Sequence, residues 1–363
     1  MAVYEIKQAR SAPKDLNGPI HWMKEKLFAT PFDIIQTLII FSFLAWVIPA
    51  FLDWAVFNAS FSGTVMADAK GTGANWIFIK EKFGMFVYGF YPEDQIYRIN
   101  IVFTLFFVTV ILFKYVAKSL FSKLILFLLY PIVSFFLING GYFGLELVST
   151  NKWGGLLLTL VISYVGIVLS LPLGTLLAFG RQSPLPIIKN LSIGYIEFIR
   201  AVPLITMLFM GSVLLPLFFE DGVELDKLLR ALIVIIMVES AFISEAIRGG
   251  LQAIPKGQYE AADSLGLGYW QKMLFVILPQ ALKVSIPNLV GISIELLKDT
   301  SLVMIIGLFD LLSMVHLTSS DSNWLGMETE GYVFVTFVYW IICYSMSKYS
   351  MILEDRFNTN NKD

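Results

Sequence analysis

The sequence has very few of the residues from which disulfides, metal sites and nucleophilic active sites are built. Its only cysteine, Cys343, cannot form an internal disulfide and lies in an apolar run, so we expect it to be an apolar filler. The two histidines, His21 and His316, are isolated, and the sequence therefore predicts no metal-ligand cluster. The phosphate-binding pattern G-x-x-x-x-G-K-[ST] is also missing, so the chain has no visible cradle for nucleotide phosphates.

Charged residues are scarce, and long apolar runs take their place. Only 15% of the 363 residues are charged and 57% are hydrophobic, compared with about 25% and about 45–50% in soluble domains. The mean hydropathy is +0.73, and runs of about 20 apolar residues, enough to cross a hydrocarbon core of about 30 Å, recur along the chain. The composition predicts an all-α membrane protein with several spans. Residues 1–30 lack the pattern of a cleaved signal peptide.

We expect about eight transmembrane helices, with a three-span extension over residues 1–150, including a long outer loop at 53–99, and a five-span core over residues 151–363. The predicted spans lie near residues 34–52, 100–117, 121–139, 155–179, 201–219, 229–248, 281–315 and 331–350. The seventh is too long for one straight crossing, because about 35 residues form a helix of about 50 Å. It also contains the polar stretch ELLKDTSL, residues 295–302, so we predict a broken helix covered there by protein or a watery cavity.

The distribution of Lys and Arg orients the chain in the membrane. These residues are concentrated in the segments that are cytoplasmic if the N-terminus is inside, whereas the predicted outer loop 316–330 contains neither. Cytoplasmic loops of membrane proteins carry this excess of positive charge. We therefore predict that both termini are cytoplasmic, which places residues 256–281 on the cytoplasmic side.

One cytoplasmic segment, EAADSLGLGYWQKMLFVILPQA at residues 260–281, differs from the apolar runs around it. The first part of this segment, with the residues just before it, predicts a short helix that begins after Pro255 and ends at Gly266 and Gly268. This helix presents small residues to an approaching surface. A second helix follows, and Pro279 marks the entry to the next span. The spacing alone fits an ordinary amphipathic connector as well as it fits a docking hairpin.

The same segment resembles the EAA motif of importer permeases of the ATP-binding-cassette (ABC) class. The matching residues are Glu260, Ala261, Ala262, Gly266, Leu278 and Pro279, with Val276 where isoleucine is usual. Similarity to the polar-amino-acid permeases, the histidine/glutamine permease subfamily, extends over residues 154–174, 196–210, 244–268 and 298–312. The resemblance is dense over about residues 150–355 and loose over 1–150, and it points to a permease subunit of the general L-amino-acid importers.

This resemblance implies a type I ABC importer permease core that forms half of a translocation pathway for L-amino acids. It implies that residues 256–281 form a coupling loop that docks on a separate, dimeric ATPase subunit, where ATP is hydrolysed. A homologous second permease and a periplasmic amino-acid-binding protein would complete the importer in a bacterial inner membrane. The chain would then be no enzyme, would carry no catalytic residue, metal or cofactor, and would bind no nucleic acid.

Several polar residues lie within the predicted spans, where they are costly and therefore candidates for function. The candidate substrate pathway consists of Glu239, Ser240, Glu295, Lys298, Asp299, Thr300 and Ser301. Because an amino acid is a zwitterion, we hypothesise that Glu239 or Glu295 binds its ammonium group. Lys298, or the amides at Thr300 and Ser301, would bind its carboxylate, since a half-helix begins near this point.

Some of these residues have a second interpretation. Lys298 and Asp299 could pair with each other and simply hold the break together. Glu239 departs from the family pattern, in which a small or apolar residue is usual, so it either lines the pathway of this transporter or contacts the partner chain. Near the inner end of the sixth span, Glu245 and Arg248 lie three residues apart. Either they pair at a cytoplasmic gate, or Arg248 simply anchors the helix at the inner membrane surface.

Two other functions are weighed against the importer. An intramembrane enzyme needs a nucleophile with a base, or a carboxylate with a histidine, converging within the spans, and Cys343 and the two histidines do not offer that arrangement. An ion-coupled secondary carrier would show internal repeats and no docking hairpin. Deletion of residues 259–268 separates these functions, since only the importer would lose its association with an ATPase.

Overall fold

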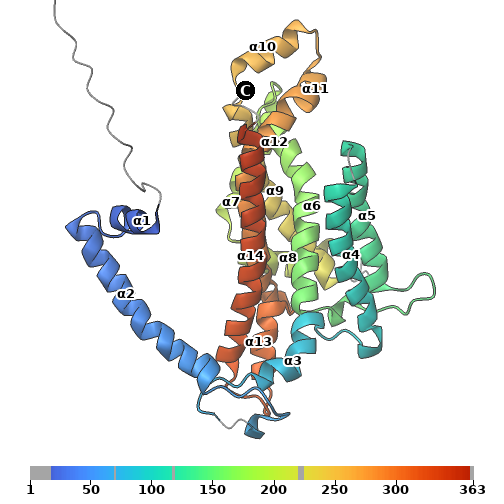
Figure 1. The fold of residues 1–363 in the computed structure, drawn as a ribbon. Coiled ribbons are helices and arrows are strands. Elements are labelled where there is room, and N and C mark those ends of the chain that lie inside the picture. Colours follow the sequence, from blue (N-terminus) through green and yellow to red (C-terminus); the bar gives the residue numbers. More distant parts are fainter. Residues whose placement is uncertain (1–17, 69–70, 117–118, 220–224, 360–363) are drawn as a thin grey trace, which may run out of the picture. The chain divides into compact units, whose positions relative to one another are not determined.

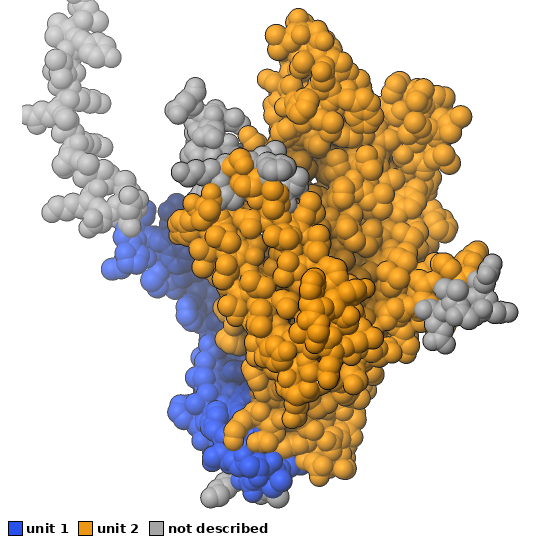
Figure 2. All heavy atoms as spheres, turned by 90° about the vertical axis from the view of Figure 1, so that its right-hand side faces the viewer, with its two compact units in different colours: residues 1–77 blue, residues 78–363 orange. Residues whose placement is uncertain are grey.

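The structure, a computed structural model, describes residues 18–68, 71–116, 119–219 and 225–359. These ranges are largely helical, and the β pairing within them consists of isolated bridges, so the predicted all-α class is confirmed. The chain divides into two compact units, Met1–Ile77 and Phe78–Asp363, which are coloured separately in Figure 2. The functional division expected at residues 150/151 stays a prediction.

The first unit contains a short helix, α1 (Pro19–Lys26), and a long one, α2 (Pro31–Leu52). Thr30 caps α2, because its hydroxyl accepts from the Asp33 N–H at 3.2 Å while the Asp33 carboxylate accepts from the Thr30 N–H at 3.0 Å. This capping box satisfies N–H groups that a helix start leaves unpaired. Helix α2 is apolar on every side and Thr37 is its one buried residue, which suits a helix surrounded by lipid. A π-helical turn, η1 (Asp53–Phe57), and a 3-10 turn, η2 (Met66–Asp68), follow.

The second unit is a bundle of helices (Figure 1). Its longer helices are α3 (Ile77–Tyr88), α4 (Ile96–Tyr115), α5 (Leu120–Asn139), α6 (Gly155–Arg181), α7 (Pro186–Ala201), α8 (Leu204–Leu214), α9 (Lys227–Ala253), α12 (Leu278–Asp299), α13 (Leu311–Ser319) and α14 (Glu328–Thr359). The 3-10 turns are η3 (Glu93–Gln95), η4 (Thr150–Lys152) and η5 (Leu215–Phe218). Helices α10 and α11 lie at one end of this bundle, here called the hairpin end, and α3 and α13 lie toward the other, the far end.

Helices α6, α9 and α12 pack closely at the centre of the bundle because glycines lie where they cross. At Gly174 of α6, a Cβ atom would lie 2.8 Å from the Ser240 carbonyl oxygen of α9. At Gly250 of α9, a Cβ atom would lie 2.5 Å from the Ala281 carbonyl oxygen of α12. Such small residues let helix backbones approach within a bilayer, where association depends on close packing.

Two apolar clusters of described residues lie in the bundle. The larger joins α6, α9 and α12 with parts of α4 and α8, and its members include Leu158, Ile162, Val234, Ile235 and Leu296. The second lies at the hairpin end and includes Phe179, Ile247, Leu251, Met273 and Ile277. The second cluster therefore connects the last turns of α6 and α9 with the segment that leads into α12.

A bend of 104° separates α7 from α8. Val202 is extended at the bend (φ −102°, ψ 130°), as the residue before a proline prefers, and Pro203 precedes the first residue of α8. The span predicted near residues 201–219 begins close to the start of α8, but α7 was not predicted. Buried and exposed residues are mixed along α7, so this helix lacks the continuous apolar run by which the spans were recognised.

The structure has a helix at each of the eight predicted span positions, and it breaks the seventh as predicted. Helix α12 ends at Asp299, a 3-10 segment, η7 (Thr300–Ile306), follows, and Gly307 (φ +77°) turns the chain before α13. By length and composition, three described helices qualify as membrane spans, residues 31–57, 93–115 and 155–181, and the bent α7–α8 pair gives a fourth. Helices α9 and α12 carry several charges each, so the total of eight crossings stays a prediction.

Candidate functional site

The segment with the EAA-like residues forms a helical hairpin at the hairpin end of the bundle (Figure 1). Helix α10 (Lys256–Ser264) leads to a turn in which Gly266 is left-handed (φ +71°). Helix α11 (Tyr269–Gln271) then continues through a π-helical turn, η6 (Lys272–Ile277), directly into α12. The second arm of the hairpin is thus an extension of a bundle helix.

Contacts at its base fix the hairpin to the rest of the bundle. Ala262 is buried, and the hydroxyl of Tyr259 donates to the Leu251 carbonyl oxygen at 3.3 Å. Burial raises the pKa of the Tyr259 phenol above its ordinary value, so the group stays neutral and keeps its proton for this hydrogen bond. Lys272 forms an ion pair with Asp263 at 2.5 Å, which closes the hairpin across its turn.

The remaining motif residues lie on the surface of the hairpin or at its junction with α12. The exposed members are Glu260, Ala261 and Gly266. Leu278 and Pro279 form the first turn of α12, where the missing N–H of a proline is tolerated. Leu265, beside the turn, is 78% exposed. Leu265 thus lies next to the exposed motif residues at the tip of the hairpin.

Five charged residues form a network toward the hairpin end, here called the gate cluster. They are Arg181 of α6, Glu197 and Arg200 of α7, and Glu245 and Arg248 of α9. The carboxylate of Glu245 lies 2.8 Å from Arg181 and 2.7 Å from Arg248. It also lies 3.8 Å from Arg200, while Arg181 reaches Glu197 at 3.0 Å. The predicted Glu245–Arg248 pair is confirmed, and it belongs to a network that joins three helices.

A cavity of about 300 Å³, here called the acidic cavity, adjoins the gate cluster. Its charged lining residues are Arg200, Glu239, Glu295 and Asp299. Glu239 is buried on α9, with 4% of its surface exposed, whereas Glu295 is exposed and Asp299 is partly buried. The guanidinium of Arg200 lies over the ring of Phe242, 5.5 Å from its centroid. The cavity therefore opens between α9, the last turns of α12 and the α7–α8 bend.

The charges of the acidic cavity suit a ligand that carries both signs of charge. Three carboxylates against one guanidinium favour a positive group, which can pair with a carboxylate at little cost of desolvation. Arg200 presents a planar fork that matches a carboxylate group. The structure thus brings together three of the predicted pathway residues, Glu239, Glu295 and Asp299. It adds Arg200, which sequence reasoning did not include because its contribution depends on the bend at Val202.

The other predicted pathway residues do not line this cavity. Their hydroxyl groups bond to nearby backbone, with Ser240 donating to Met237, Thr300 to Leu297 and Ser301 to Lys298, at 2.8, 2.9 and 2.9 Å. Lys298 is exposed and, within the described residues, forms no salt bridge with Asp299. The hydrogen bonds of Thr300 and Ser301 lie at the break between α12 and η7, whereas that of Ser240 stays within α9.

A family model described as the inner membrane component of binding-protein-dependent transport systems matches residues 170–358. The chain belongs to this family of ABC transporter permeases. It is similar to the inner membrane amino-acid ABC transporter permease protein YhdY of Escherichia coli K12, at 49% identity over 96% of both chains. It is also similar to the glutamate/glutamine/aspartate/asparagine transport system permease protein BztC of Rhodobacter capsulatus, at 37% identity over 99% of this chain and 98% of that one.

A solved structure of an amino acid ABC transporter with histidines matches with 30% identity and a TM-score of 0.49, and covers 56% of this chain and 92% of that chain. The family membership establishes the chain as a permease subunit of the type I fold in a binding-protein-dependent ABC importer. It is a multi-pass inner-membrane protein, and ATP is hydrolysed on a separate subunit. A second permease and a substrate-binding protein complete such a transporter, so neither an intramembrane enzyme nor a secondary carrier is supported.

Proposed function

We propose that this permease transports amino acids and that residues 256–281 are its coupling loop. The substrate class is supported by the two relatives that span nearly the whole chain, since their names specify amino acids. The observation that carries the coupling role is the hairpin itself, which is continuous with α12 and exposes Leu265 at its tip. Mechanical coupling of this kind requires no cofactor on this chain.

In this proposal the hairpin moves α12 when the ATPase closes on nucleotide. The exposed side of α10, with Glu260 and Ala261, rests in a groove of the ATPase subunit, and α11 and η6 pass its motion to α12. Helix α12 ends at Asp299, in the lining of the acidic cavity. Nucleotide closure at one end of the helix therefore changes the cavity at its other end, as in the rigid-body rocking of transporter segments.

The acidic cavity is proposed as this subunit's part of the translocation pathway. Glu239, with Glu295 or Asp299 beside it, binds the ammonium group of the passing amino acid. Arg200 binds the carboxylate. It has the role for which the sequence suggested Lys298 or the amides at Thr300 and Ser301. The partner permease supplies the opposite wall.

The proposed topology places the hairpin and both termini in the cytoplasm. The C-terminal part of α14 lies at the hairpin end of the bundle (Figure 1), which agrees with a cytoplasmic C-terminus if the hairpin meets the ATPase. Residues 1–150 are proposed as an extension with three spans, and the loop at 53–99 then lies in the periplasm. Cysteine labelling at Ser264 and at Ser320 tests this arrangement, because only the first should react from the cytoplasmic side.

Reconstitution of the complete importer in liposomes tests the function. With the ATPase, the partner permease and the loaded binding protein present, we expect amino-acid uptake that requires ATP. Deletion of residues 259–268 should abolish uptake and association with the ATPase while membrane insertion stays normal. Transport retained by the deletion variant, or transport by this chain without the ATPase, contradicts the proposal. A single substitution in the exposed loop at Ser320, matched for expression, serves as the control.

A further inference from the structure

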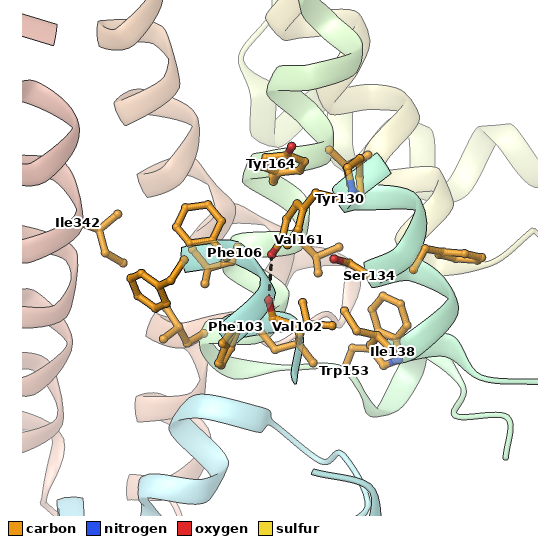
Figure 3. Close-up of a pocket in the computed structure, with 17 residues that line it drawn as sticks. Val102, Phe103, Phe106, Tyr130, Ser134, Ile138, Trp153, Val161, Tyr164 and Ile342 are labelled. Atoms are coloured by element: carbon orange, nitrogen blue, oxygen red, sulfur yellow. Dashed lines mark hydrogen bonds between the residues drawn. The ribbon is translucent and has the colours of Figure 1, made fainter. Parts of the chain in front are cut away.

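A second, larger pocket lies between α4, α5 and α6, away from the acidic cavity (Figure 3). Its volume is about 410 Å³, within the range of about 300–1,000 Å³ that is common for ligand sites. Its walls come from the middle of α4, the second half of α5, the first half of α6 and Ile342 of α14. Neither the coupling hairpin nor the gate cluster contributes to it, so the transport mechanism leaves this pocket without a role.

Aromatic side chains hold the pocket open. The rings of Tyr130 and Tyr164 meet edge to face at 5.4 Å between centroids, and the rings of Phe106 and Tyr130 lie 5.9 Å apart. Helices α4 and α5 pack on each other more closely than either packs on α6. Large, rigid rings thus stand between the α4–α5 pair and α6 and leave a space beside them. The pocket is not enclosed by the described residues, so the space is expected to be filled by a molecule from its surroundings.

The lining decides what kind of molecule fits. Among the residues that the structure describes, no charged side chain lines the pocket, and its surface is almost entirely apolar. An amino-acid zwitterion would enter with two unpaired charges, at a large cost in free energy. Apolar cavities of this kind also do not hold water. Because the lining belongs to helices that cross the bilayer, the apolar molecules available to it are lipids.

Two polar groups in the wall lack hydrogen-bond partners. The hydroxyl of Ser134 and the indole N–H of Trp153 are buried and have no hydrogen-bond partner within 3.5 Å; the Ser134 hydroxyl lies near that of Tyr130. Leaving a buried donor without an acceptor is costly in free energy, so such groups usually have a partner. In Figure 3 the Ser134 hydroxyl turns toward the middle of the pocket, near Val161, and Trp153 lies at its lower side. The missing partners are acceptors, which a hydrocarbon alone does not provide.

Both groups lie in the part of the pocket nearer the far end of the bundle. Trp153 precedes the first residue of α6 by two positions, and Ser134 lies five positions before the end of α5, about 8 Å along a helix. From there the apolar wall continues along α6 as far as Val165, a further length of about 15 Å. The pocket thus has donors at one side and a long apolar wall leading toward the middle of the bilayer.

We propose that this pocket binds one acyl chain of a membrane phospholipid, whose ester oxygens accept hydrogen bonds from the Ser134 hydroxyl and the Trp153 N–H. The chain lies along Phe106, Leu157 and Val161 and fills the space that the aromatic rings leave. The lipid enters from the leaflet at the far end of the bundle. It joins the α4–α5 pair, which lies outside the residues matched by the family model, to α6 of the permease core.

Photo-cross-linking tests the proposal on the complete importer in lipid nanodiscs. The probe is a phosphatidylethanolamine with a photoreactive group in the acyl chain, and cross-linked peptides are mapped by mass spectrometry. We expect the strongest labelling on pocket residues of α5 and α6. Val161→Trp, which fills the pocket, should lower this labelling at least tenfold. Leu169→Trp, at a 49% exposed position on α6 outside the pocket, should leave it unchanged.

Two further variants test the polar contacts. Ser134→Ala and Trp153→Phe each remove one donor, and each should lower the labelling about fivefold, the effect of one hydrogen bond of about 1 kcal/mol. Adding phospholipid to the delipidated complex should raise the melting temperature of the wild type more than that of these variants. This measurement tests the proposal even if the Val161→Trp complex does not assemble. Equal labelling of all lipid-facing positions overturns the proposal. So does cross-linking of a partner permease helix in the pocket, or equal stabilisation of wild type and variants by phospholipid.

Discussion

The carboxylate of Glu245 lies 2.8 Å from the guanidinium of Arg181, and this contact joins α9 to the last residue of α6. Arg248 lies on the other side of the same carboxylate at 2.7 Å. Arg200 completes the group at 3.8 Å and also lines the acidic cavity. Any motion that separates α6, α7 and α9 at the hairpin end must therefore break contacts of Glu245 and move a cation of the proposed pathway.

Glu245→Gln should destabilise the gate cluster. The substitution leaves three arginines near an uncharged amide. The cost should lie between the about 0–1 kcal/mol of an exposed ion pair and the about 3–5 kcal/mol of a buried one, because the network is partly buried. We expect a lower unfolding free energy of the complex and faster ATP hydrolysis without substrate, because the closed arrangement of α6, α7 and α9 is weakened. Denaturant unfolding of the purified complex and ATPase assays without binding protein measure both effects.

Glu197→Gln is the matched control for this substitution. Glu197 is 56% exposed at its side chain and pairs only with Arg181 among the described residues, and exposed ion pairs contribute about 0–1 kcal/mol. The two variants change the net charge equally. Equal effects of both on unfolding and basal ATP hydrolysis would show that Glu245 has no central role.

Gly266→Ala should weaken the coupling of this subunit to the ATPase. Gly266 has φ +71°, a conformation that costs a residue with a Cβ atom about 1–2 kcal/mol, so the turn between α10 and α11 is expected to distort. Substrate-stimulated ATP hydrolysis should fall severalfold while the amount of chain in the membrane stays normal. Gly268→Ala is the control, because Gly268 has an ordinary φ of −64°. Full stimulation in the Gly266 variant would contradict this role of the turn.

Much of the fold follows from patterns that are local in the sequence. Apolar runs gave the positions of the long helices, and the polar stretch at 295–302 predicted the break that the structure shows after Asp299. The glycines Gly266 and Gly268 correctly predicted the end of α10. Helix α7 was not predicted because it is amphipathic and contains no continuous apolar run. Its position is set by its contacts with α6 and α9, which the sequence does not show.

The candidate site was predictable in part, for a related reason. Burying a carboxylate in a span is costly enough that Glu239 could be singled out from its position alone. The contribution of Arg200 depends on the 104° bend between α7 and α8, and the contact of Arg181 with Glu245 joins residues 64 positions apart. The sequence carries no local signal for such pairings.

Gly174→Leu should disrupt the centre of the bundle. A Cβ atom at this position would lie 2.8 Å from the Ser240 carbonyl oxygen and 2.6 Å from the Ile243 side chain, and the backbone of α9 cannot yield as a flexible side chain would. Overpacking of this kind costs about 1–3 kcal/mol or more. We expect a lower melting temperature and less assembled complex. Gly291→Ala, in α12 with nothing within 4 Å of its Cβ position, should be neutral or stabilising, since alanine favours a helix over glycine by about 1 kcal/mol.

Glu239→Gln should lower transport without affecting assembly. The proposed bond between this carboxylate and the substrate ammonium is charge-assisted, and its loss is expected to cost about 1.5–3 kcal/mol, a fall of about 10- to 150-fold in kcat/KM. Uptake is measured with a fixed concentration of loaded binding protein, so that changes in substrate capture do not contribute. Ser240→Ala is the control, because the neighbouring hydroxyl bonds to the Met237 carbonyl oxygen and does not line the cavity. If Glu239→Gln transports as well as Ser240→Ala, with both complexes equally assembled, Glu239 does not contact the substrate and the acidic cavity is not the pathway.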